Sequence, residues 1–182
     1  MHVEAVLLTG GRSSRMGMDK ASLRIHGETM VDRIGRLLGE VGVPLTILGP
    51  QGKPDSQPLA GPLVALSEFS PTAPSVLVVS CDIPGFNPRL VEFLHRQKGD
   101  FDAAIPNLEG RLQPLCGLYS SNAFQDASAL VRQGETRVMR WLECLRVKAI
   151  EPENFVRAGL DPDCARGANT RAEWEALTLN RQ

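Results

Sequence analysis

The hydrophobic pattern of this chain alternates between two kinds of segment. Short, nearly continuous apolar runs are typical of buried strands, and they cover residues 4–9, 44–48, 75–80, 101–106 and 147–150. The segments between them predict helices at residues 29–41, 62–69, 88–97, 123–132 and 136–145, with a last helix beginning near residue 170. Strands that alternate with helices predict a Rossmann-like, three-layer α/β fold with a mostly parallel sheet, in a single domain over residues 1–182.

Three local signals add detail to this pattern. Residues 49–58 are rich in glycine and proline, which predicts a loop. Residues 112–120 read as extended but contain Pro114, and because proline cannot donate to a sheet ladder we expect an edge strand there. At the last helix Thr170 is placed to cap the first turn, and Glu173 stands three residues later in the capping-box position.

Composition limits the function classes that remain. The chain has 182 residues, with 20 Lys and Arg against 21 Asp and Glu, so no global positive field favours nucleic acid or an anionic membrane. No apolar run approaches the roughly 18 residues of a membrane span. The four cysteines are scattered without a C-x-x-C pair, which argues against a zinc site and a disulfide framework. We therefore expect a cytoplasmic protein with no nucleic-acid or membrane partner.

The loop after the first strand carries chemistry of its own. Residues 7–20 read L-L-T-G-G-R-S-S-R-M-G-M-D-K. Gly10 and Gly11 let backbone amides approach an anion closely. Arg15 can bind phosphate oxygens with two parallel hydrogen bonds, and Lys20 supplies a positive charge on a flexible side chain. This predicts a phosphate site, although the spacing fits neither a Walker loop nor G-x-G-x-x-G. The alternative is a solvated turn that needs glycine for its backbone angles.

Asp82 is the second candidate, because it directly follows the apolar run at residues 75–80. In an open parallel sheet, ligands bind at the carboxyl ends of the strands, so we expect Asp82 at the same sheet edge as Gly10. A carboxylate there, completed by water, suits Mg²⁺ beside phosphates. The alternative is that Asp82 only caps the turn before Ile83 and Pro84.

These residues resemble a known family. The segment at residues 7–20 is similar to the signature L-x-G-G-x-S-x-R-M-G-x-D-K of the molybdenum cofactor guanylyltransferases, within the nucleotidyltransferase superfamily. The segments L-A-G-P-L-V-A-L, V-V-S-C-D-I-P, Q-P-L-C-G-L-Y and A-N-T-R-A-E-W resemble further blocks of the family, in its order and over nearly the whole chain. The resemblance implies a nucleotidyltransferase fold and transfer of GMP from GTP to molybdopterin that bears molybdenum, with release of pyrophosphate.

The resemblance also implies site residues. Leu8, Thr9 and Gly10 match positions that bind the guanine nucleotide, Lys20 matches a lysine that contacts it, and Asp55 aligns with an aspartate that binds it. The metal and acceptor positions are matched by Asp82 as the Mg²⁺ ligand, Arg15 beside the phosphates and Asn169 near the pterin. The family has two asparagines near the pterin end; Asn169 matches one of them, and residues 166–168 replace the first. Cofactor-insertion chaperones or apo-molybdoenzymes would be the protein partners.

The catalytic set is therefore Arg15, Lys20 and Asp82, which would hold the triphosphate so that the acceptor phosphate meets the α-phosphorus. Two alternatives remain. One is a molybdopterin cytidylyltransferase that uses CTP, although that subfamily tends toward A-A-G where this chain has T-G-G. The other is a nucleotide-binding adaptor without catalysis that delivers the cofactor. The basic segment 134–140 would either meet an anionic pterin phosphate or simply start a solvated helix.

Overall fold

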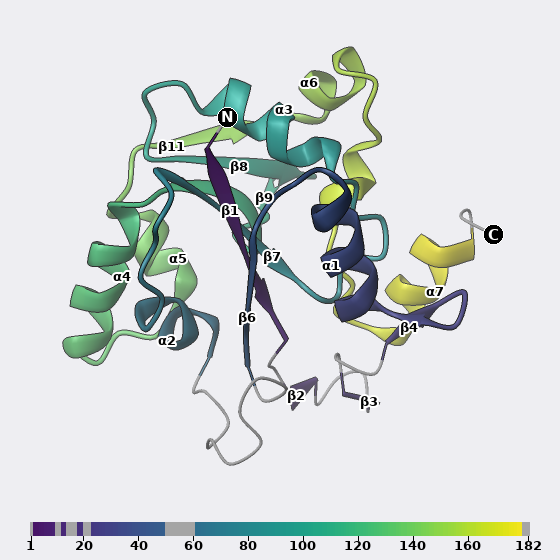
Figure 1. Ribbon diagram of the computed structural model, residues 1–182, viewed down its shortest axis with the longest axis horizontal. Helices are drawn as coiled ribbons and strands as arrows, with labels where there is room; N and C mark the ends of the chain where they lie inside the picture. The colour runs from purple at the N-terminus through teal and green to yellow at the C-terminus, as the bar shows by residue number, and fades with distance from the viewer. Residues whose placement is uncertain (1, 10–11, 14–17, 20–22, 50–60, 180–182) are drawn as a thin grey trace.

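The computed structural model describes residues 2–9, 12–13, 18–19, 23–49 and 61–179 (Figure 1). The strands are β1 (Val3–Leu8), β2 (Arg12–Ser13), β3 (Met18–Asp19), β4 (Arg24–Ile25), β5 (Glu28–Thr29), β6 (Leu45–Leu48), β7 (Ser75–Ser80), β8 (Ala103–Leu108), β9 (Arg111–Leu112), β10 (Cys116–Ser120) and β11 (Val147–Ile150). The helices are α1 (Met30–Glu40), α2 (Pro62–Ser67), α3 (Arg89–Lys98), α4 (Ala123–Arg132), α5 (Val138–Leu142), α6 (Pro152–Arg157), the 3-10 helix η3 (Pro162–Ala165) and α7 (Arg171–Leu179).

The central sheet has the order β11-β8-β10-β7-β1-β6, with β9 paired to β8 outside this path. The neighbours of β1 are both parallel to it, and β11 is parallel to β8, so the prediction of a mostly parallel sheet is confirmed. β10 is antiparallel to both β7 and β8. The expectation of an edge strand at residues 112–120 was therefore wrong. Pro114 precedes β10 instead of lying within it, so an interior strand loses no ladder hydrogen bond there.

Helices cover both faces of the sheet and give the predicted three layers (Figure 1). On one face, side chains of α1, α3 and α6 pack on Ala5 and Leu7 of β1 and on Leu77 and Val79 of β7. On the other face, α2, α4 and α5 pack on the alternate residues of the same strands. A strand buried on both faces is mostly apolar, which is why β1 and β7 read as nearly continuous apolar runs; the buried Glu4 of β1 accepts hydrogen bonds from the amides of Thr72 and Ala73.

Hydrogen bonds at the helix starts explain where two helices begin. The Thr29 hydroxyl accepts a hydrogen bond from the Asp32 amide at 3.1 Å and caps α1. At α7 the Thr170 hydroxyl accepts from the Glu173 amide at 3.1 Å, and the Glu173 carboxylate accepts from the Thr170 amide at 3.1 Å. The predicted capping box at the last helix is therefore confirmed.

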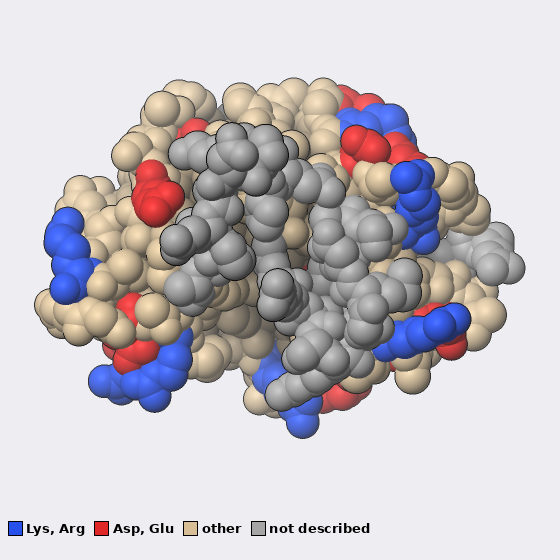
Figure 2. All heavy atoms as spheres, turned by 90° about the horizontal axis from the view of Figure 1, so that it is seen from below, with Lys and Arg blue, Asp and Glu red and all other residues tan. Residues whose placement is uncertain are grey.

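The parallel strands place several chain ends at one edge of the sheet. β1, β6 and β7 are adjacent, and Leu8 lies opposite Leu48 on one side and Ser80 on the other. Figure 2 views the molecule from the side on which β1 and β6 end. The described Lys and Arg side chains lie around the margin of that face, interspersed with Asp and Glu. This edge of the sheet is where an open α/β fold binds its ligands.

Candidate active site

Main-chain hydrogen bonds join the ends of three strands into one rigid edge. The Cys81 amide donates to the carbonyl of Leu8 at 3.1 Å, and the Thr9 amide donates to the carbonyl of Leu48 at 2.9 Å. Leu8 and Thr9 are both buried. The end of β1 is therefore fixed, because Leu8 and Thr9 are hydrogen-bonded to the segments that follow β7 and end β6.

Asp82 lies two residues beyond β7 and is 6% exposed. The hydroxyl of Ser80 donates a hydrogen bond to Oδ1 of Asp82, and the amide of Ala168 donates to the Asp82 carbonyl at 2.8 Å. Gly167 lies against the same carboxylate: a Cβ at this position would be 3.4 Å from Oδ1. Both the side chain and the main chain of Asp82 are thus held by neighbouring segments.

A cavity of about 180 Å³ opens beside Asp82. Its polar lining includes Ser80, Asp82, Gln113 and Asn169, and its remaining lining residues are Ile83, Pro114, Leu115, Cys116, Ala165 and Gly167. Asn169 is exposed, and its backbone amide donates a hydrogen bond to the Glu173 carboxylate at 2.6 Å. The structure therefore brings two of the predicted site residues, Asp82 and Asn169, to the wall of one cavity.

The structure describes only some of the other predicted site residues. Gly10, Gly11, Arg15, Lys20 and Asp55 lie outside the described residues. The predicted roles of these residues in binding and catalysis therefore stay predictions, as do the nucleotide contacts expected of Leu8 and Thr9.

Sequence reasoning missed three residues of the cavity wall. Ser80 and Gln113 are on motif segments, but only Asp82 stood out there because a carboxylate suggests a metal ligand. Gly167 carries no chemical group, so its closeness to Asp82 is visible only in three dimensions.

The donor set at this edge suits a metal that brings other ligands with it. The described residues contain no group of three or more His, Cys, Asp or Glu side chains able to hold a metal ion by themselves. Mg²⁺ commonly binds through one or two carboxylates together with water and substrate phosphates. The buried carboxylate of Asp82, with the cavity next to it, fits a metal of that kind and does not fit an all-protein cage.

Burial raises the pKa of the Cys116 thiol well above its ordinary value, and the nearby Cys164 and Asp82 raise it further. The thiolate, not the thiol, is the nucleophile. Cys116 therefore lines the cavity as a small apolar side chain and does not supply a nucleophile. The four cysteines, all within the described ranges, form no disulfide.

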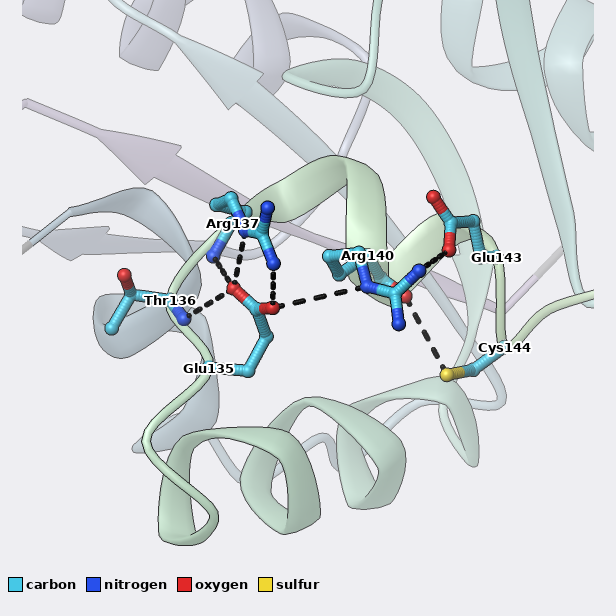
Figure 3. A network of polar contacts seen from close by, with 6 residues as sticks. All are labelled: Glu135, Thr136, Arg137, Arg140, Glu143 and Cys144. Atoms are coloured by element: carbon cyan, nitrogen blue, oxygen red, sulfur yellow. Dashed lines mark hydrogen bonds and ion pairs between the residues drawn. The ribbon is translucent and has the colours of Figure 1, made fainter.

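The basic segment 134–140 is ion-paired within itself (Figure 3). The Arg137 guanidinium donates to the Glu135 carboxylate at 2.9 and 2.6 Å, and Arg140 lies between Glu135 and Glu143 and pairs with both. Two arginines are thus balanced by two glutamates on the surface. This arrangement favours the interpretation as a solvated helix start, here the start of α5, over a site for pterin phosphate.

A mostly parallel α/β sheet, with a glycine loop after its first strand and a buried aspartate after a neighbouring strand, is the architecture of a nucleotidyltransferase. The family model for the MobA-like NTP transferase domain matches residues 5–149. The chain belongs to this family.

Named relatives agree with the family model. A protein of Pelotomaculum thermopropionicum named probable molybdenum cofactor guanylyltransferase is 31% identical over 167 residues, which cover 85% of this chain and 82% of that protein. A protein of Clostridium perfringens (strain ATCC 13124) with the same name is 32% identical over 194 residues, which cover 98% of this chain and 97% of that protein. The likeness to the Clostridium perfringens protein thus extends over nearly the whole length of both chains.

Solved structures share the fold. Molybdopterin-guanine dinucleotide biosynthesis protein A from Archaeoglobus fulgidus superposes with a TM-score of 0.71 at 18% identity and covers 98% of each chain. Rv0371C of Mycobacterium tuberculosis, in a complex with manganese, superposes with a TM-score of 0.53 at 17% identity over 83% of this chain and 89% of that chain.

Within the described ranges, no helix has both the length and the apolar character needed to cross a membrane.

Proposed function

We propose that this protein transfers GMP from GTP to molybdopterin bearing molybdenum and releases pyrophosphate. The observation that carries the proposal is the buried carboxylate of Asp82, which is fixed at the sheet edge where β1 enters the glycine loop. Family membership and the guanylyltransferase names of relatives at 31% and 32% identity support the choice of reaction.

The reaction needs positioning and charge neutralisation more than acid–base chemistry. An oxygen of the terminal phosphate of molybdopterin attacks the α-phosphorus of GTP. As the new P–O bond forms, the bond from the α-phosphorus to the α–β bridging oxygen breaks, and its electron pair leaves with pyrophosphate. Because the attacking oxygen is already an anion, no strong general base is required. Holding the two phosphates in line supplies much of the rate enhancement.

The residues divide this work by chemistry. From the family resemblance we assign Arg15 and Lys20 to the triphosphate, with backbone amides at Gly10 and Gly11 beside them. Leu8, Thr9 and Asp55 are assigned to the nucleoside. Asp82 would hold Mg²⁺, which when bound neutralises the triphosphate and the charge that develops on pyrophosphate.

The acceptor is assigned to the cavity next to Asp82. A carboxylate-held metal and an acceptor phosphate must lie within a few ångströms of each other, and the cavity is the described space that adjoins the carboxylate. Gln113 and Asn169 line it with amide groups that can donate and accept hydrogen bonds. We assign these two side chains to the pterin end of the acceptor.

The alternatives are less well supported. The relatives quoted above are named for the guanine enzyme, which favours GTP over CTP. An adaptor without catalysis would not need a fixed carboxylate beside a phosphate loop. We expect the product to pass to apo-molybdoenzymes or their insertion chaperones in the cytoplasm, where the cysteines of this chain would stay reduced.

The test is pyrophosphate release by the purified protein. With molybdopterin and Mg²⁺, GTP should give pyrophosphate far faster than CTP, and Asp82→Ala should abolish the reaction while thermal denaturation shows a folded protein. Equal turnover of CTP would overturn the guanine assignment. Binding of GTP without pyrophosphate release from any acceptor would favour the adaptor.

A further inference from the structure

We infer that Ser80 is a positioning residue that sets the affinity of the site for its divalent metal by holding the carboxylate of Asp82. The inference rests on the proposed function, since it deepens the role given to Asp82. It concerns a side chain that lines the cavity beside Asp82 and is not assigned as a ligand of the metal. Its effect would pass through one hydrogen bond.

Ser80 is held in one place by the sheet. It is the last residue of β7, which lies between β1 and β10, and it is 8% exposed. In register it lies opposite Leu8 of β1, and its amide donates to the carbonyl of Leu115 at 2.9 Å. The backbone that carries this hydroxyl is therefore fixed by β1 on one side and β10 on the other.

The hydroxyl of Ser80 has a single proton, and it donates that proton to Oδ1 of Asp82. This bond orients the carboxylate without cancelling its charge, because a hydroxyl is neutral. An arginine or lysine in the same place would also orient the carboxylate, but its positive charge would oppose a bound cation. The serine thus leaves Asp82 both fixed and fully able to attract a metal.

The opposite segment of chain completes the arrangement. The Ala168 amide fixes the carbonyl of Asp82 at 2.8 Å, and Gly167 passes close to the carboxylate without a side chain between them. The Ala168 amide thus fixes the main chain of Asp82, while the Ser80 hydroxyl contributes to the direction of its carboxylate. Loss of the hydroxyl would remove one of the hydrogen bonds that orient Oδ1.

Partners that orient a metal ligand commonly change metal affinity by roughly 10–100-fold when they are removed. We therefore expect Ser80→Ala to raise the dissociation constant for the divalent metal by about 10-fold or more. Ser80→Thr keeps the hydroxyl and should bind metal nearly as the wild type does. At saturating metal, Ser80→Ala should recover much of its pyrophosphate release, because the liganding carboxylate is still present.

The experiment titrates Mn²⁺ into the full-length protein with GTP present and follows bound Mn²⁺ by electron paramagnetic resonance. This readout measures the metal directly and does not depend on turnover. The matched control is Ser128→Ala on α4, because the Ser128 hydroxyl is partly buried and, like that of Ser80, donates a hydrogen bond, here to the carbonyl of Ser67 at 2.7 Å. Thermal denaturation of each variant verifies the fold.

The inference is supported if Ser80→Ala binds Mn²⁺ at least several-fold more weakly while Ser80→Thr and Ser128→Ala match the wild type. It is overturned if folded Ser80→Ala binds Mn²⁺ as the wild type does, or if Ser128→Ala weakens binding equally. Failure of the proposed function looks different. In that case the wild type itself would release no pyrophosphate, or Asp82→Ala would bind Mn²⁺ normally.

Discussion

Thr9 donates two hydrogen bonds to the carbonyl oxygen of Leu48, one from its amide at 2.9 Å and one from its hydroxyl at 3.2 Å. This pair joins the end of β1 to the end of β6 at the point where the chain enters the glycine loop. Because both the amide and the hydroxyl of Thr9 donate within the fold, a nucleotide donor that contacts Thr9 would meet its backbone carbonyl.

The first prediction replaces this hydroxyl by a methyl group. Thr9→Val keeps the shape of the side chain and removes one buried hydrogen bond, so it should lower the free energy of unfolding by about 1 kcal/mol. Urea denaturation measures the change. The dissociation constant for GTP should hardly move, since the backbone is retained, whereas a large loss of GTP affinity in a folded Thr9→Val protein would assign the hydroxyl to the nucleotide.

A second prediction concerns the space beside the carboxylate of Asp82. In Gly167→Ala the new methyl group would lie 3.4 Å from Oδ1 of Asp82, which is ordinary van der Waals contact. The protein should therefore fold normally but lose part of the cavity. We expect the KM for molybdopterin to rise more than the KM for GTP in steady-state assays of pyrophosphate release.

A matched control for Gly167→Ala is Gly39→Ala on α1, where an added Cβ meets nothing within 4 Å. Its kinetics should equal those of the wild type. If Gly167→Ala changes neither KM, the acceptor does not occupy the space next to residue 167.

The third prediction is a pH dependence of the surface cluster drawn in Figure 3. The hydrogen bond from the Arg137 side chain lowers the pKa of the Glu135 carboxyl from its ordinary value of 4.5 to about 2. A lowered pKa means that the folded state favours the ionised form. The contribution of Glu135 to stability should be complete above about pH 4.5 and should be lost as the pH falls toward 2.

Urea denaturation of the wild type and of Glu135→Gln from pH 2 to 6 tests this. The stability difference between the two proteins should shrink as the pH falls, because the wild-type carboxyl then becomes neutral as well. A difference that stays constant over this range would contradict the assigned pKa. An exposed pair such as this is screened by salt, so the measurement belongs at low ionic strength.

Much of the fold follows from local sequence. The bounds of β7, α4 and β11 agree with those predicted, because each is a clear apolar or amphipathic segment between strong breakers. The hairpin between β8 and β9 was not foreseen. Its turn places Glu109 at φ 53° and Gly110 at φ 73°, and a glutamate in the left-handed region is not a standard turn signal. The short helix α6 was missed because six residues give little periodicity.

The candidate site also has a part that the sequence predicts and a part that only the fold reveals. Asp82 was predictable because its chemistry and its place after a strand are both written in the sequence. Ser80 and Gly167 act through closeness to that carboxylate, and residues 80 and 167 are brought together only by the fold. No pattern within either segment indicates that meeting.

The direction of β10 has a consequence for how the cavity beside Asp82 could change its shape. Because β10 runs against β7, its first residue, Cys116, lies opposite Val79 near the end of β7. The residues just before it, 113–115, therefore reach the cavity directly from the β8–β9 hairpin. Insertions or deletions in that hairpin would reshape one wall of this cavity, while the pairing of β1 with β7 would stay unchanged. If the proposed function holds, the reversed strand would let the acceptor site vary independently of the nucleotide site.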